Sequence, residues 1–113
     1  MPVWSVPTPG EQPNTLENWS VYEVQIAALD APTRHAVGYA VDVGEGRVSS
    51  PIVEFDVTSR RLRTRSGRVY SLRGRPGSDA DARYVWSAWK EINNAQELRD
   101  VTFELFPNPE AAS

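Results

Sequence analysis

Arginine dominates one short stretch of this chain. The segment RRLRTRSGRVYSLRGR, residues 60–75, holds seven arginines and no acidic residue, although the whole chain carries a net charge of −3. A guanidinium group binds a carboxylate or a phosphate through two parallel hydrogen bonds, and it also stacks on aromatic rings. The stretch therefore predicts a contact surface for acidic groups, on either a protein or a nucleic acid.

Carboxylates close by account for part of this charge. Glu54 and Asp56 share one face of a predicted strand, and a turn at 58–59 would place them opposite Arg63 and Arg61. Two close carboxylates could also be the catalytic pair of a glycoside hydrolase, but cross-strand pairing with the arginines explains them better. We therefore expect Arg61 and Arg63 to be neutralised within the fold.

The remaining arginines of the stretch have no acid near them in the sequence. They fall at the tip of a predicted hairpin, whose loop 65–67 ends in glycine, and at its opposite end. Aromatic side chains dominate interface hot spots, so the tryptophan in the proline-rich N-terminal segment is a further candidate. The expected contact residues for a partner are Arg65, Arg68, Arg73, Arg75 and Trp4.

Residues for catalysis or metal binding are scarce. His35 is the single histidine and no acidic motif surrounds it, so we expect an exposed residue at a strand end. The chain has no cysteine, no G-x-S-x-G elbow and no phosphate-binding glycine loop. The sequence predicts a protein that is not an enzyme and that has no cofactor and no metal site.

Alternating apolar residues predict a sheet to carry these side chains. The strands are expected within 18–29, 35–43, 51–57, 61–64, 68–73 and 100–106. Gly38 and Ala40 share a face of the second strand, which indicates close approach by another element. The predicted fold class is α+β, an antiparallel meander sheet or open barrel of five to six short strands with one packed α-helix.

One helix is expected over residues 79–92, with Ser78 as its N-cap. Apolar residues recur there at spacings of three and four and predict a buried stripe: Ala82, Val85, Trp86, Trp89 and Ile92. A small-ligand pocket between this helix and the sheet, near the two tryptophans, is a weaker alternative function.

The chain of 113 residues predicts one domain at 17–106, between an extended proline-rich arm at 1–16 and a frayed tail at 107–113. No apolar run is long enough to span a membrane, and the N-terminal residues do not form a signal peptide. The lack of cysteine favours a cytoplasmic location.

The segments SGRVYSLRGRPG and YVWSAWKEIN resemble short uncharacterised proteins of bacterial mobile elements, namely phages, integrative elements and gene cassettes. The resemblance extends over residues 48–93 at most. It implies a bacterial accessory protein that binds host or element proteins, and it carries no catalytic residues.

These observations leave two principal functions open. The first is a binding module that recognises a protein partner through an arginine-rich sheet face, as an accessory or inhibitor protein would. The second is nucleic-acid binding through the hairpin at 60–75. The acidic remainder of the chain disfavours this function, and the whole chain has an isoelectric point of about 5.1. The sequence does not determine the oligomeric state.

Overall fold

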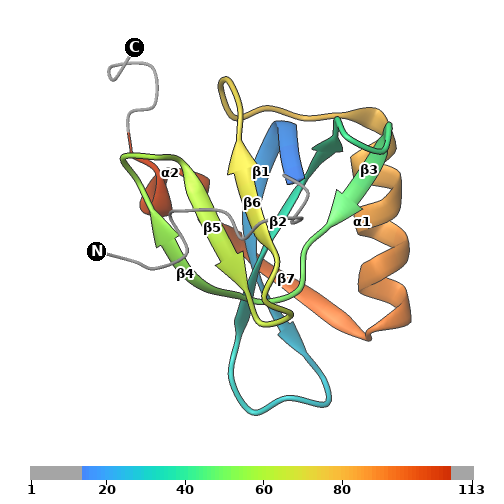
Figure 1. Cartoon of the computed structure of the whole chain (residues 1–113). Coiled ribbons are helices and arrows are strands. Elements are labelled where there is room, and N and C mark those ends of the chain that lie inside the picture. Colours follow the sequence, from blue (N-terminus) through green and yellow to red (C-terminus); the bar gives the residue numbers. More distant parts are fainter. Residues whose placement is uncertain (1–13, 108–113) are drawn as a thin grey trace.

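The computed structural model describes residues 14–107 and has an α+β architecture, with a seven-stranded sheet and one main helix (Figure 1). The elements follow in the order β1 (Asn14–Ile26), β2 (Thr33–Ala40), β3 (Glu45–Val48), β4 (Ile52–Asp56), β5 (Arg61–Thr64), β6 (Val69–Leu72), α1 (Ala80–Ile92), β7 (Ala95–Asp100) and α2 (Thr102–Leu105). None of the described helices is long and apolar enough to cross a membrane.

The sheet is not a simple meander. Its strand order is β3-β2-β1-β6-β5-β4, and β7 pairs with β1 beside this path. The expectation of five to six strands in an antiparallel meander was therefore wrong in two respects. The sheet has seven strands, and β1 pairs with β6 in parallel through Asn14 and Tyr70, Thr15 and Ser71, and Leu16 and Leu72.

β1 organises the sheet because it is long enough to have three neighbours. One of its edges pairs with β2, while its other edge pairs with β6 at residues 14–16 and with β7 at residues 22–26. The pairing with β2 is irregular between Glu17 and Ser20, where Asn18 has a φ of 48°. This irregularity changes which side of the strand faces the interior, and Trp19 is fully buried as a result.

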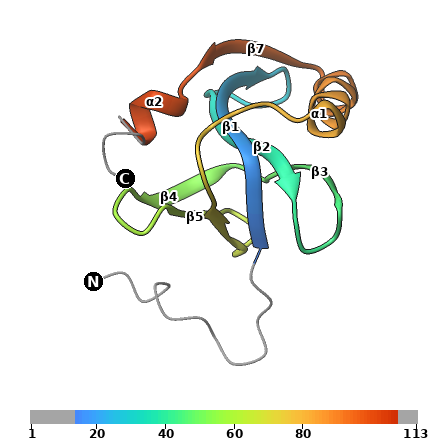
Figure 2. The same ribbon diagram turned by 90° about the horizontal axis from the view of Figure 1, so that it is seen from above.

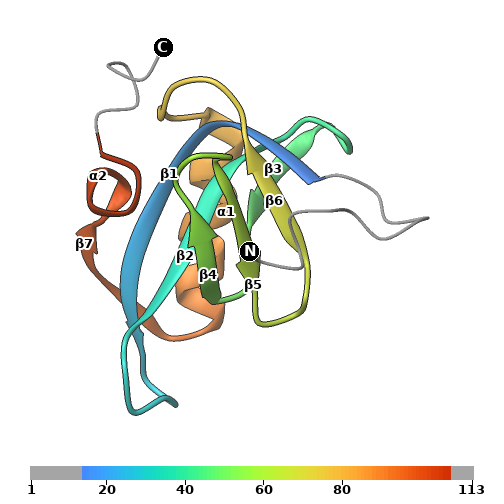
Figure 3. The same ribbon diagram turned by 60° about the vertical axis from the view of Figure 1, so that its left-hand side comes forward.

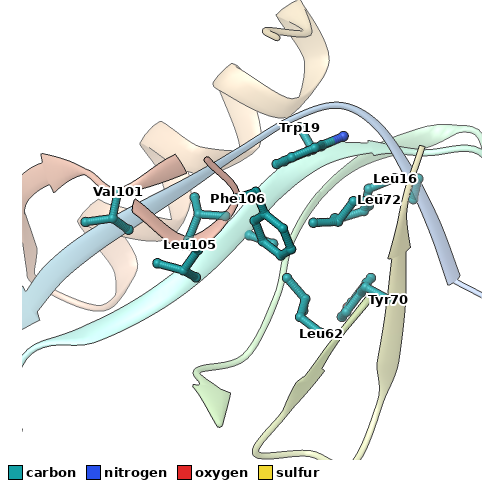
Figure 4. Packing of buried hydrophobic residues seen from close by; sticks show 11 residues of the cluster. Leu16, Trp19, Leu62, Tyr70, Leu72, Val101, Leu105 and Phe106 are labelled. Carbon is teal, nitrogen blue, oxygen red and sulfur yellow. The ribbon is translucent and has the colours of Figure 1, made fainter. Parts of the chain in front are cut away.

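One face of the sheet encloses the larger group of buried side chains, here called the interior cluster. The ring of Trp19 packs edge-on against Phe106, with their centroids 5.5 Å apart (Figure 4). Trp19 also lies against Gly38, where an added Cβ would stand 3.1 Å from it, so the expected close approach at Gly38 is confirmed. The cluster consists of Leu16, Trp19, Val21, Ala36, Ala40, Leu62, Tyr70, Leu72, Val101, Leu105 and Phe106.

The second buried group, the helix cluster, joins α1 to β1 and β2. Its buried members are Val24, Val37, Ala82 and Trp86, and the partly buried side chains that pack around them are Tyr22, Ile26, Val48, Trp89 and Ala95. Viewed from above, α1 lies beside β1, β2 and β3, while α2 lies at the opposite side (Figure 2). Because both faces of β1 are covered in its middle part, Trp19 and Val21 face the interior cluster and Tyr22 and Val24 face the helix cluster.

The helix was predicted within one residue of its observed bounds, but two details were wrong. The N-cap is Asp79, whose Oδ2 accepts a hydrogen bond from the backbone N–H of Ala82 at 2.9 Å, and not Ser78. Ile92 was expected in the buried stripe and is 82% exposed, because it lies roughly a quarter of a turn around the helix from the stripe that Ala82, Trp86 and Trp89 form.

The closing segment was predicted as a strand over 100–106, and this was wrong. β7 ends at Asp100, and residues Thr102–Leu105 form the short helix α2. Asp100 favours this start, since its Oδ1 accepts from both the N–H and the hydroxyl of Thr102. Val101 and Leu105 are buried, but Phe103 points to solvent.

The two hairpins that carry the arginines were predicted correctly. Phe55 pairs with Leu62, and Leu62 pairs with Tyr70, as the apolar pattern required. Gly67 closes the loop between β5 and β6 with a φ of 91°, a conformation that glycine adopts without strain. Figure 3 shows β4, β5 and β6 side by side, with β5 between the other two, and β4 is the last strand in the pairing order.

Candidate partner-binding surface

Arginines and acids alternate across the outward face of the sheet. Glu54 on β4 pairs with Arg63 on β5, and this ion pair was expected from the hairpin register. Asp56 and Arg61 are also cross-strand partners. The Asp56 carboxylate accepts from the N–H of Thr58 at 3.1 Å and from the hydroxyl of Ser59 at 2.9 Å, so it also fixes the turn between the two strands.

Arg73 is held by an acid that lies far away in the sequence. Its Nε donates to Oε2 of Glu17 at 2.8 Å, across the parallel pair of β1 and β6. The guanidinium of Arg60 donates to the carbonyl of Gly74 at 3.0 Å and joins the two ends of the same hairpin. Arg73 was expected to be available for a partner, and in the structure Glu17 occupies it.

The tip of the β5–β6 hairpin, residues 65–68, is here called the arginine tip. Arg65 and Arg68 are exposed there, and no carboxylate within the described residues lies within 4.0 Å of either guanidinium. Two like charges on one loop are not neutralised by the fold. The structure thus brings these two predicted contact residues together on one loop.

The arginine tip is anchored at its base. The N–H of Arg65 donates to the carbonyl of Pro51 at 2.8 Å, and the N–H of Ser66 donates to the hydroxyl of Ser50 at 3.3 Å. The N–H of Gly67 closes the loop onto the carbonyl of Thr64 at 2.8 Å. Because the backbone is fixed, the two arginines lose little conformational freedom of the loop on binding.

The other two predicted contact residues lie elsewhere. Arg75 is exposed in the segment between β6 and α1. Trp4 lies outside the described residues. The structure therefore places Arg65 and Arg68 on one loop and Arg73 and Arg75 at the other end of the hairpin.

His35 was expected to be exposed and is fully buried instead. Its Nδ1 lies 2.8 Å from the carbonyl of Ser49, so Nδ1 carries the proton, and Nε2 accepts from the hydroxyl of Thr33 at 2.7 Å. Its ring packs 4.6 Å from the ring of Trp89. Burial lowers the pKa of His35 below its usual value of 6.5, the Ser49 hydrogen bond raises it, and the charge of Arg65 lowers it. These contacts make His35 a structural residue of the core.

The space between α1 and the sheet is filled by aromatic rings. Tyr22 stacks on Trp86 with centroids 5.2 Å apart, and Trp86 stacks on Trp89 at 5.3 Å. The cavity beside Ser20 and Ala82 has a volume of only about 10 Å³. A wide-open depression of about 460 Å³ near the end of α1 has a polar lining that includes Lys90 and Glu97. Neither space has the enclosed apolar walls of a small-molecule site.

No group of three or more potential metal ligands occurs within residues 14–107.

The structure also reveals an apolar edge that the sequence reasoning did not identify. Alternation places Val53, Phe55 and Val57 on the strand face opposite Glu54 and Asp56, yet these apolar side chains are 52%, 42% and 45% exposed. β4 is the last strand of the sheet, so no further strand covers these side chains. Strand order depends on contacts between distant segments, and no local pattern in residues 51–57 could have shown it.

Comparison with protein-family models, with curated proteins and with solved structures finds no match for this chain.

Proposed function

We propose that this protein is a non-enzymatic binding module that recognises carboxylates of a protein partner through its arginine tip. The observation that carries this proposal is the contrast between two groups of arginines. Arg63 and Arg73 are bonded to acids of the fold, whereas Arg65 and Arg68 meet no carboxylate within the described residues. A rigid loop that presents two such guanidinium groups suits bidentate recognition of carboxylates.

The distribution of charge favours a protein over a nucleic acid. A protein that follows a phosphate backbone needs a continuous row of positive charge. Here Glu17 and Glu54 interrupt the row on the sheet face, and Tyr70, the one aromatic residue of the hairpin, is buried and cannot stack on a base. Contact through a short charged loop on an otherwise acidic molecule is typical of electrostatically complementary protein pairs.

The resemblance to proteins of bacterial mobile elements adds to this proposal. An accessory or inhibitor protein of such an element acts by binding another protein, and it needs no catalytic residues. A cytoplasmic site of action agrees with the absence of cysteine from the sequence. In the same proposal, Arg75 and Trp4 contribute to the contact outside the arginine tip.

Cross-linking in the cell of origin tests the proposal. The wild type, an Arg65→Ala/Arg68→Ala variant and an Arg83→Ala control are each cross-linked, and the captured proteins are compared by quantitative mass spectrometry. Arg83 is an exposed arginine on α1 that also meets no described carboxylate, so the control removes the same kind of charge elsewhere. We expect a partner that the wild type and the control capture and that the double variant does not. Arg65→Glu should also lose this partner, and changing the contacting acid of the partner to lysine should restore the binding, because the two charges are then exchanged.

A gel-shift titration against random DNA and RNA tests the competing function. We expect no binding at physiological salt. Micromolar or tighter binding that weakens steeply with salt, by about one unit of log–log slope for each phosphate contact, would show that the arginine tip serves a nucleic acid.

A further inference from the structure

The free edge of the sheet lies beside the arginine tip. Among residues 14–107, β4 pairs with β5 alone, so one row of its backbone N–H and C=O groups takes no part in strand pairing. The arginine tip is bonded to Pro51, the residue directly before β4. An exposed edge of this kind is a template for pairing with another chain, and natural proteins usually cover or charge it.

Three apolar side chains of this edge, Val53, Phe55 and Val57, are exposed to solvent. Phe55 rests on the interior cluster, with its ring 5.6 Å from that of Phe106, and nevertheless stays 42% exposed. Val57 continues the same face beyond the strand. A shift in register between Ile52 and Glu54 makes the backbone irregular at Val53, so the regular part of the edge runs from Glu54 to Asp56, and Val57 follows it in the turn. A short added strand could bury the exposed parts of the Phe55 and Val57 side chains.

A second copy of this chain does not fit the edge. Two copies of β4 paired antiparallel around Phe55 would bring apolar side chains together on one face. On the other face the same register would place Glu54 of one copy opposite Asp56 of the other. Like charges directly opposite each other destabilise a strand pair. The edge therefore selects a strand of different sequence.

We propose that an extended segment of the partner protein adds to β4 as an additional strand. This inference rests on the proposed function and specifies how the partner is held. Apolar side chains at alternate positions of that segment lie over Phe55 and Val57, and uncharged or basic side chains face Glu54 and Asp56. Main-chain hydrogen bonds supply affinity and the alternate side chains supply selectivity, as in other cases of strand addition.

The charge at the end of that segment follows from the position of the arginine tip. Adjacent strands lie about 4.8 Å apart, so an added strand would run about two spacings from β5, from which Arg65 extends. A long arginine side chain and a carboxylate side chain bridge a distance of that order. The segment thus carries an acidic residue at the end beside Pro51, where it meets Arg65 or Arg68.

Peptide selection tests this mode of binding. A library of random ten-residue peptides is displayed on phage and selected on the immobilised full chain. We expect enrichment of sequences with apolar residues at alternate positions and an acid at one end. The dissociation constant of a synthetic peptide of the enriched sequence is then measured by calorimetry. Val57→Lys should weaken its binding about tenfold or more, because it removes an apolar contact and places a charge against the apolar side chain of the peptide.

Val43→Lys is the matched control, because Val43 is 57% exposed in the turn between β2 and β3, at the other end of the sheet. This variant should bind the peptide as the wild type does. Methylation of the peptide amides that face β4 should abolish binding, while methylation of the alternate amides should leave it unchanged. Equal binding to the Val57→Lys and wild-type chains, or no enriched sequence at all, would overturn the inference.

Two further outcomes separate this inference from the proposed function. If Arg65→Ala/Arg68→Ala weakens the captured partner while Val57→Lys does not, the arginine tip binds a partner and strand addition is wrong. If the wild type forms a dimer in analytical ultracentrifugation and Val57→Lys abolishes it, the edge pairs with a second copy and the proposed strand from a partner is wrong.

Discussion

Position in the sheet, more than position in the sequence, decides what each arginine does. Arg63 and Arg65 are two residues apart, yet the first pairs with Glu54 and the second meets no carboxylate within residues 14–107. Arg73 lies close to the tip in the sequence and is held by Glu17 through the pairing of β1 with β6. Exposed pairs of this kind contribute only up to about 1 kcal/mol each to stability. Their main consequence is to confine the uncompensated charge to one loop.

His35 supports a prediction at the same scale. Its pKa is lowered in the folded protein, chiefly by burial, so the unfolded chain takes up a proton at a higher pH than the folded chain does. Stability is therefore at its full value above a pH of about 6.5 and declines as the pH falls from there toward the folded pKa, by at most about 1.4 kcal/mol per pH unit.

The measurement is urea unfolding of the wild type and of His35→Gln at several pH values on both sides of that range. The variant has no group that titrates at this position, so the difference in unfolding free energy between the two proteins should shrink as the pH falls. A constant difference would show that His35 is not responsible for the acid sensitivity.

At the scale of elements, those set by neighbouring residues were predicted from the sequence, and those that depend on distant contacts were not. The β4–β5–β6 hairpins followed from alternation and charge matching between neighbours, and α1 followed from its apolar stripe. Residues 101–105 show why other parts could not be predicted. Burial of Val101 and Leu105 fits a strand and a helix equally well, since a spacing of four satisfies both periods. Phe103 distinguishes the two, because a strand would place it on the same face as Val101 and Leu105, whereas a helix turns it away from them. Only the packing of Val101 and Leu105 in the interior cluster decides between these conformations, and Phe103 then points outward.

The same limit applies to the candidate site. The sequence indicated the arginine tip because its residues are neighbours. It could not indicate that Glu17 holds Arg73 or that β4 ends the sheet, because both depend on where β1 lies. His35 was placed in solvent for the same reason, since Trp89 covers it from an element more than fifty residues away.

Gly46 gives a prediction about the contact of β3 with α1. A Cβ at this position would lie 2.5 Å from the backbone N and Cα of Ala82, and the N–H of Gly46 donates to Asp81 at 2.6 Å. Gly46→Ala must therefore push the start of α1 away from the sheet, and it should destabilise the protein by several kcal/mol, as overpacking against fixed backbone does, at or above the usual range of about 1–3 kcal/mol.

Gly77→Ala is the matched control, because its Cβ would stand 3.4 Å from the nearest atom, the side-chain oxygen of Asn18. Thermal unfolding of the two variants measures the difference. Equal melting temperatures would mean that α1 does not contact β3 as closely as the structure shows.

At the scale of the whole molecule, β1 joins the two clusters into one unit. Leu16, Trp19 and Val21 belong to the interior cluster, and Val24 belongs to the helix cluster. The closing segment is bonded to the middle of β1, where the N–H of Val101 donates to the carbonyl of Val21 at 2.8 Å. Neither cluster can be disrupted without displacing the strand that the other requires. The molecule should therefore unfold in one cooperative transition, as small single domains usually do.

Phe106→Ala tests this coupling. Phe106 is 2% exposed and packs on Trp19 and Phe55, so the truncation should lower the unfolding free energy by about 3–5 kcal/mol. Urea unfolding is followed by far-ultraviolet circular dichroism, which reports on α1, and by tryptophan fluorescence, which reports on both clusters. Both signals should shift to the same lower midpoint, although Phe106 does not belong to the helix cluster. Phe103→Ala, in the adjoining helix α2 at 62% exposure, should leave the midpoint nearly unchanged. Separate midpoints for the two signals would show that the helix and the interior of the sheet unfold independently, and β1 would then not couple them.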